Sequence, residues 1–259
     1  MISIKILIYS PIIVLNEQSF FEQMEFASGF GADLLVFGEG AATPYTELLS
    51  GMDVLNGEEY NYVLESLYGF CFELGCAAVF NGIDDFGMHF CIFVNPFAED
   101  GETFNKLYIK HATSFGSVFE LEDYKDCIDE IFQPIVFKGI KLALCMGDDI
   151  FLPKIFERYR LNGVTAAVNC FESDTATQSY KDTLRDISQA NNIVIVSAGI
   201  GGAVEVVTPE CQKHIQKLSD NLYMSEFDKA DFAKKCGLLQ NDLSARYVPE
   251  GKTELYKLL

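Results

Sequence analysis

The chain has 259 residues, of which 49% are hydrophobic and 22% are charged, and this suits one large domain or two small ones with an ample core. Its formal net charge of −19 argues against nucleic acid and against an anionic membrane surface as partners, because both are themselves negative. An acidic surface also keeps an ordinary protein soluble, so the charge by itself names no partner.

Eight cysteines are scattered along the chain without a C-x-x-C pair, and only three histidines accompany them. The spacing of zinc ligands is therefore missing, and we expect no metal and no other cofactor. Several cysteines fall in apolar runs, where a free thiol behaves as a small hydrophobic side chain. We expect a reduced, cytoplasmic protein.

The first residues are apolar enough to suggest a signal peptide, but Lys5 and Pro11 interrupt the run and no small-residue cleavage site follows. Alternation over Ser3–Tyr9 predicts a strand instead. No apolar run reaches the roughly 18 residues that a membrane span needs, so we expect no contact with a membrane.

Strand-like and helix-like segments alternate from one end of the chain to the other, as is typical of α/β proteins. In chain order we expect a strand at Ser3–Tyr9, a helix at Glu17–Phe30, a strand at Asp33–Phe37, a helix at Glu58–Leu74, strands at Ala77–Asn81, His89–Val94, Phe104–Ile109, Ile131–Phe137 and Lys141–Cys145, a helix at Leu152–Leu161, a strand at Thr165–Cys170, a helix at Ser179–Ala190, a strand at Ile193–Ser197, a closing antiparallel set at Ala203–Thr208, Lys213–Lys217 and Leu222–Phe227, and a short helix at Lys229–Cys236.

Hairpins are too frequent in this order for a single doubly wound sheet. The mixture predicts two sheets packed together with helices outside, in one domain over residues 1–239, followed by a polar C-terminal arm at 240–259. The glycine cluster Gly199–Gly202 predicts a tight turn rather than a phosphate loop, because no helix-forming segment follows it.

Three residues at or just past strand ends supply the parts of a nucleophilic site. Glu39 follows the buried strand at Asp33–Phe37, Lys110 follows Phe104–Ile109, and Cys145 ends its own strand. Ligands of open α/β sheets bind at the carboxyl ends of strands. A thiol needs a base to remove its proton and a cation to hold the charge that attack creates. Taken singly, each has an ordinary explanation: a surface carboxylate, a solvated hairpin lysine and a buried small residue.

The order and flanks of these three residues resemble the nitrilase superfamily, the carbon–nitrogen hydrolases. Residues 31–39, GADLLVFGE, continuing to Thr43-Pro44-Tyr45, are similar to the segment around the family's catalytic glutamate. Tyr108-Ile109-Lys110-His111 is similar to its lysine motif, and Gly139–Cys145 to the strand that leads to its nucleophile. Two departures stand out: Gly38 takes the place of a proline, and Met146–Asp149 inserts one residue after the cysteine.

The resemblance implies a four-layer α-β-β-α sandwich of two mixed sheets flanked by helices, which would pair as a homodimer. It implies that Cys145 attacks a small carboxamide, carbamoyl compound or nitrile, with Glu39 as base and Lys110 as oxyanion stabiliser. Glu120 is expected as a fourth member, with Glu122 as its rival in the same loop. The residues expected to line the substrate pocket are Tyr45, Met146, Asn169 and Phe171.

Two other functions remain open from the residues. The altered flanks also fit a scaffold that has lost catalysis and binds a partner. The thioester could instead pass to an amine, which is acyl transfer rather than hydrolysis. His89 and His111 are expected to be structural or exposed, because the implied mechanism needs no histidine.

Overall fold

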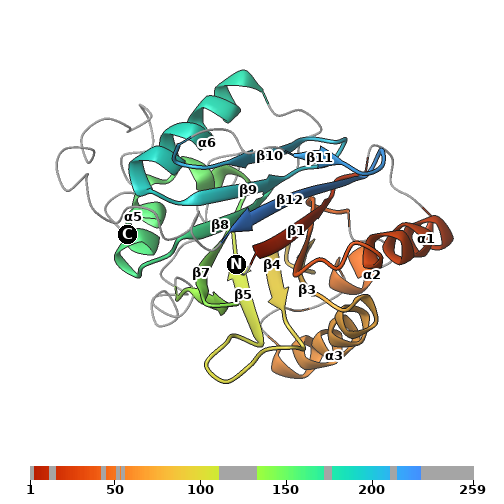
Figure 1. Cartoon of the computed structure of the whole chain (residues 1–259). Coiled ribbons are helices and arrows are strands. Elements are labelled where there is room, and N and C mark those ends of the chain that lie inside the picture. Colours follow the sequence, from red (N-terminus) through yellow and green to blue (C-terminus); the bar gives the residue numbers. More distant parts are fainter. Residues whose placement is uncertain are drawn as a thin grey trace.

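The computed structural model describes residues 3–11, 16–41, 45–50, 53, 56–110, 133–171, 177–210 and 215–228. Two β-sheets lie face to face and helices cover the outer face of each one (Figure 1). The fold is therefore α/β with four layers, as the sequence predicts. Among the described helices, none combines the length and the apolar character that crossing a bilayer requires.

The first sheet has seven strands in the order β11-β12-β1-β2-β3-β4-β5. Their bounds are β1 Ser3–Tyr9, β2 Leu34–Phe37, β3 Ala77–Ile83, β4 His89–Val94, β5 Asn105–Ile109, β11 Gln216–Lys217 and β12 Leu222–Asp228. β1, β2 and β3 run parallel, and the outer neighbours pair antiparallel on both sides.

The second sheet has five strands in the order β10-β9-β8-β7-β6. Their bounds are β6 Ile135–Phe137, β7 Ile140–Met146, β8 Ala166–Cys170, β9 Val194–Ala198 and β10 Val204–Val207. The three central strands are parallel and the two edge strands antiparallel. The sheet is thus mixed like the first one.

Helices α1 (Glu17–Ser28), α2 (Tyr45–Ser50) and α3 (Gly57–Leu74) lie on the first sheet, whereas α5 (Pro153–Leu161) and α6 (Gln178–Asn191) lie on the second (Figure 1). Three of these helices have an asparagine or threonine N-cap whose side chain accepts a hydrogen bond from a backbone N–H of the first turn. These N-caps are Asn16, Asn56 and Thr177. Such caps satisfy donors that the helix itself leaves without a partner.

The core divides by strand alternation, because successive side chains point to opposite faces of a sheet. In β1 and β2, Ile6 and Val36 belong to the core between the two sheets. Their neighbours Leu7 and Phe37 belong to the second core, under α1 and α3. Both cores are rich in residues with no exposed surface. Burial of apolar surface is the main favourable contribution to folding.

Several details differ from the sequence-based expectations. The closing set is not one antiparallel group: β10 forms a hairpin with β9, whereas β12 pairs with β1 and β11 in the other sheet. Hydrophobic pattern alone does not tell which sheet a strand joins, so this part of the prediction is wrong. The short helix at Lys229–Cys236 and the arm at 240–259 lie outside the described residues.

Candidate active site

The three predicted catalytic residues lie at one edge of the sandwich, at the carboxyl ends of β2, β5 and β7. Glu39 follows β2 after one residue, Lys110 directly follows β5, and Cys145 is the second-last residue of β7. His89 begins the antiparallel strand β4 and therefore lies at the same edge, since Phe90 is the partner of Ile109. The register of the first sheet brings the segments of Glu39, His89 and Lys110 to this edge. β7 belongs to the second sheet and reaches them by packing against β4 and β5.

Glu39 is almost fully buried, with 5% of its surface exposed. Its Oε1 lies 2.5 Å from Nδ1 of His89, whereas its Oε2 is buried and makes no hydrogen bond in the described structure. Asn81 holds the loop: its amide donates to the backbone oxygens of Phe37 and Gly38, and its Oδ1 accepts the Gly40 N–H at 2.7 Å. The carboxylate is thus fixed through one oxygen and available through the other.

The missing proline before Glu39 has a structural cause. A Cβ added to Gly38 would lie 2.0 Å from the backbone oxygen of Gly199, a distance that no side chain tolerates. Gly199 belongs to the β9–β10 turn, and its oxygen also accepts the Ser10 hydroxyl at 2.5 Å. The turn prediction for Gly199–Gly202 is confirmed, and Gly38 is required by the docking of that turn.

Lys110 is 6% exposed, and its backbone N–H donates to the His89 oxygen at 2.8 Å. Its Nζ lies beside Gly147, where an added Cβ would come within 2.9 Å of it. Gly147 has φ +48°, so the chain turns there and not directly after Cys145. Because Gly147 has no side chain, the segment after the cysteine leaves room for the lysine ammonium.

Cys145 has no exposed surface and pairs with Asn169 of β8. Burial raises the pKa of its thiol well above the ordinary value, and the Asp149 carboxylate raises it further. The Met146 backbone N–H and the Lys110 ammonium act the other way and lower this pKa. Because the raising causes prevail, the pKa of this thiol lies above its ordinary value and the thiol is neutral near neutral pH.

Asp149 is a member of this site that the sequence reading did not single out. It is fully buried, and Tyr108, two residues before Lys110, donates its hydroxyl to Oδ2 at 2.7 Å. Asp149 and Lys110 thus place opposite charges near the same thiol. The only signal in the sequence is an aspartate four residues after the cysteine, which is weak without the fold.

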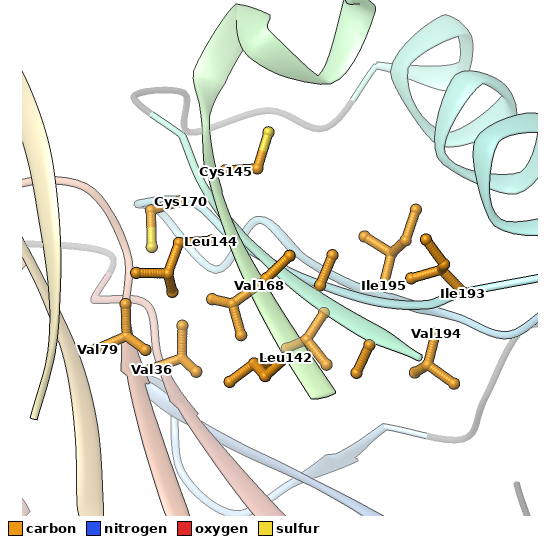
Figure 2. Close-up of a cluster of buried hydrophobic side chains, with 14 of the residues drawn as sticks. Val36, Val79, Leu142, Leu144, Cys145, Val168, Cys170, Ile193, Val194 and Ile195 are labelled. Carbon is orange, nitrogen blue, oxygen red and sulfur yellow. The ribbon is translucent and has the colours of Figure 1, made fainter. Parts of the chain in front are cut away.

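A second buried thiol, Cys170, lies near Glu39. Burial raises its pKa to about 12, the Glu39 charge raises it as well, and the Asn81 side chain lowers it. Figure 2 shows Cys170 on the side of Val36 and Val79, between the sheets. Cys145 points to the other side of β7 from Leu144 (Figure 2), as strand alternation requires.

The residues at this edge therefore form two pairs, and one of the pairs joins two of the three predicted catalytic residues. Glu39 contacts His89, and the charge of Lys110 acts on Cys145. The meeting of all three around one substrate atom stays a prediction. Glu120, Glu122 and His111 lie outside the described residues.

The four predicted pocket residues make internal contacts in this structure. Tyr45 packs its ring on Phe70 at 4.9 Å between centroids, on the helix-covered face of the first sheet. Met146 is fully buried in the core between the sheets. These contacts give a pocket role for Tyr45 no support.

Asn169 and Phe171 both meet Tyr180 of α6. The Asn169 amide donates to the Tyr180 hydroxyl at 2.6 Å, and the ring of Phe171 lies 4.8 Å from that of Tyr180. The Oδ1 of Asn169 is buried without a partner among the described residues. Their role toward a substrate stays a prediction.

His89 is the residue that the sequence reading set aside and the structure places in the site. The hairpin of β4 and β5 puts it opposite Lys110, and its ring reaches Glu39. The sequence predicts neighbouring strands at His89–Val94 and Phe104–Ile109. Pairing them as a hairpin would have placed His89 opposite Lys110 and so indicated that His89 lies in the site. Within the described ranges, no group of three or more His, Cys, Asp or Glu could hold a metal ion.

Neither a protein-family profile nor a curated protein matches this sequence. Solved structures do match, at low identity. The carbon–nitrogen hydrolase of Helicobacter pylori G27 is 13% identical with a TM-score of 0.64, over 90% of this chain and 92% of that one. Nit3 of Saccharomyces cerevisiae, a member of branch 10 of the nitrilase superfamily, is 13% identical with a TM-score of 0.62, over 89% and 92%.

A variant of the amidase from Nesterenkonia sp. AN1 is 14% identical with a TM-score of 0.62, over 98% of this chain and 96% of that one. That protein shows covalent addition of the acetamide moiety of fluoroacetamide at its active-site cysteine. Identities this low establish the architecture and not the substrate. This chain has the fold of the nitrilase superfamily, the carbon–nitrogen hydrolases.

Proposed function

We propose that the protein is a thiol hydrolase that cleaves the carbon–nitrogen bond of a small carboxamide, with Cys145 as nucleophile. The observation that carries this proposal is the position of Cys145 at the end of β7, two residues before Gly147, against which the end of the buried Lys110 side chain lies. A cation that is already in place can stabilise the oxyanion by about 3–4 kcal/mol when water is excluded.

The reaction would run in two halves. Sγ of Cys145 forms a bond to the amide carbon while its proton passes to Glu39, and the negative charge develops on oxygen beside Lys110. The C–N bond then breaks, Glu39 returns the proton to the leaving nitrogen, and a thioester remains. Water that gives its proton to Glu39 attacks the thioester, and the acid and the free thiol are released.

The resting state of the site agrees with these roles. The Cys145 thiol is neutral, since burial and Asp149 raise its pKa, so the mechanism needs a base near it. Oε2 of Glu39 is a buried acceptor without a hydrogen-bond partner among the described residues. The covalent adduct at the active-site cysteine of the Nesterenkonia amidase supports the same type of chemistry in this fold.

A binding scaffold without catalysis is the less favoured function. One of its two supports was the missing proline, and the close approach of Gly38 to Gly199 accounts for that glycine by packing alone. The other was the segment after Cys145, and Gly147 in that segment lies beside Lys110.

The test is a screen of amides, carbamoyl compounds and nitriles with ammonia release as readout. Cys145→Ala should abolish turnover while the circular dichroism spectrum is unchanged. Cys170→Ala is the matched control, because it removes the buried thiol that lies near Glu39, and it should retain turnover. The reverse result would move the nucleophile to Cys170. Adding amine acceptors during turnover separates acyl transfer from hydrolysis.

A further inference from the structure

His89 contacts both predicted catalytic residues of the first sheet, Glu39 and Lys110. Nδ1 of His89 lies 2.5 Å from Oε1 of Glu39, and the backbone oxygen of the same histidine accepts the Lys110 N–H at 2.8 Å. One residue thus touches both the base and the oxyanion stabiliser of the proposed function, on which this inference rests.

Burial makes this hydrogen bond necessary. The side chain of Glu39 is 4% exposed and that of His89 is 20% exposed. A buried carboxylate is costly unless it is hydrogen-bonded. A carboxylate that acts as a base is ionised and only accepts, so in the proposed function Nδ1 carries the proton and donates it. His89 is therefore the donor that fixes the direction of the carboxylate.

The direction matters because the two oxygens of Glu39 differ. Oε1 is occupied by His89, and Oε2 is buried with no hydrogen-bond partner in the described structure. A base acts through an oxygen that is free and correctly aimed. A partial rotation of the carboxylate would turn the second oxygen out of its aim, and the hydrogen bond from Nδ1 opposes that rotation.

We propose that His89 is a positioning residue for the base: it holds Oε1 of Glu39 so that Oε2 stays free to take the thiol proton. The histidine does not touch the reacting atoms in this arrangement. It acts through Glu39, and the pairing of β4 with β5 places it there.

Three substitutions separate this role from a purely structural one. In His89→Asn, the amide nitrogen lies the same number of bonds from the backbone as Nδ1 does, and it can donate to Oε1. In His89→Gln, the amide nitrogen lies further out, and in His89→Ala the donor is lost.

We expect His89→Ala and His89→Gln to lower kcat at least tenfold with KM nearly unchanged, and His89→Asn to recover most of the loss. Phe86→Ala is the matched control, because Phe86 lies in the β3–β4 turn just before His89 with 69% of its surface exposed. The kcat of this variant should equal that of the parent. Equal activity in the Asn and Gln variants, or a loss that only follows the melting temperature, would overturn the proposal.

A second measurement needs no substrate. Proton NMR of the full chain with 15N-labelled histidine should show a strongly deshielded Nδ1 proton that is absent in His89→Asn and moves upfield in Glu39→Gln. If Glu39→Gln leaves the signal unchanged, the inference is wrong whatever the enzyme does. If the signal behaves as expected but no amide is hydrolysed, the pairing stands and the proposed function fails.

Discussion

The candidate site has two corners built on different principles. The carboxylate corner consists of Glu39, His89 and Gly38, and the thiol corner consists of Cys145, Lys110 and Gly147 with Asp149 beside them. Each contains a glycine that has no room for a side chain, but the obstacle differs. At Gly38 it is the backbone oxygen of Gly199, and at Gly147 it is the end of the Lys110 side chain.

The charges of the corners differ as well. In the carboxylate corner, one donor fixes one acceptor at 2.5 Å. In the thiol corner, burial raises the pKa of the thiol, and a nearby anion and a nearby cation shift it in opposite directions. The comparison teaches that the base is held by a close backbone contact at Gly38 and a hydrogen bond from His89. The pKa of the nucleophile depends first on burial and then on two opposed charges.

Gly38→Ala should have the largest effect, because the added Cβ meets a backbone oxygen at 2.0 Å and the β9–β10 turn must move. Overpacking typically costs about 1–3 kcal/mol, and we expect the upper end of that range or more in the free energy of unfolding, measured by urea denaturation. The control is Gly69→Ala in α3, where no atom lies within 4 Å. It should stabilise the protein by up to about 1 kcal/mol. Wild-type stability of Gly38→Ala would show that the carboxylate corner is not rigid.

Gly147→Ala should cost less stability and more activity. The positive φ of +48° costs about 1–2 kcal/mol for a residue with a Cβ. The flexible lysine end can move away, so the displaced ammonium should lower kcat about tenfold, if oxyanion stabilisation is partly lost. The control is Gly163→Ala, which also has a positive φ and a lysine, Lys141, near its added Cβ, but lies elsewhere. Equal kcat values for the two variants would contradict the proposed role of Lys110.

Asp149→Asn tests the charge balance at Cys145. Removing the carboxylate removes one cause that raises the thiol pKa, so the pKa falls and more thiolate is present at a given pH. The rate of Cys145 alkylation by iodoacetamide at pH 8 should rise severalfold, as followed by mass spectrometry of the peptide. Asp148→Asn is the neighbouring control and should leave the rate nearly unchanged. A slower reaction in Asp149→Asn would reverse the sign of our electrostatic account.

The last expected effect is a gradual loss of stability in alkali, to which several buried groups contribute. Burial raises the pKa of Cys76, Cys170 and Tyr9 to about 12. These groups ionise in the unfolded chain above about pH 8.5–10 but stay neutral in the folded one, so unfolding releases protons and stability falls as pH rises. The free energy of unfolding should be level near neutral pH and decline between about pH 9 and 12. Cys170→Ala should decline less steeply than the parent; an identical slope would mean that this thiol is not buried in solution.

Many helices and strands were predictable because the spacing of apolar residues along the sequence indicates them. β1 and β4 begin and end where the alternation of the sequence predicts, and α3 differs by one residue. The mixture of hairpins and helices also predicted two sheets with helices outside. Residues at strand ends stand out in the same way, which is why Glu39, Lys110 and Cys145 could be singled out without any coordinates.

What the sequence by itself determined is therefore the set of elements and the residues at their ends, since both depend on neighbours a few positions apart. Only the tertiary structure decided which sheets β10 and β12 join. It also brought His89 into contact with Glu39, 50 positions away in the sequence, and placed Gly38 against Gly199. These contacts depend on how separate segments approach one another, and no pattern within a single segment carries that information.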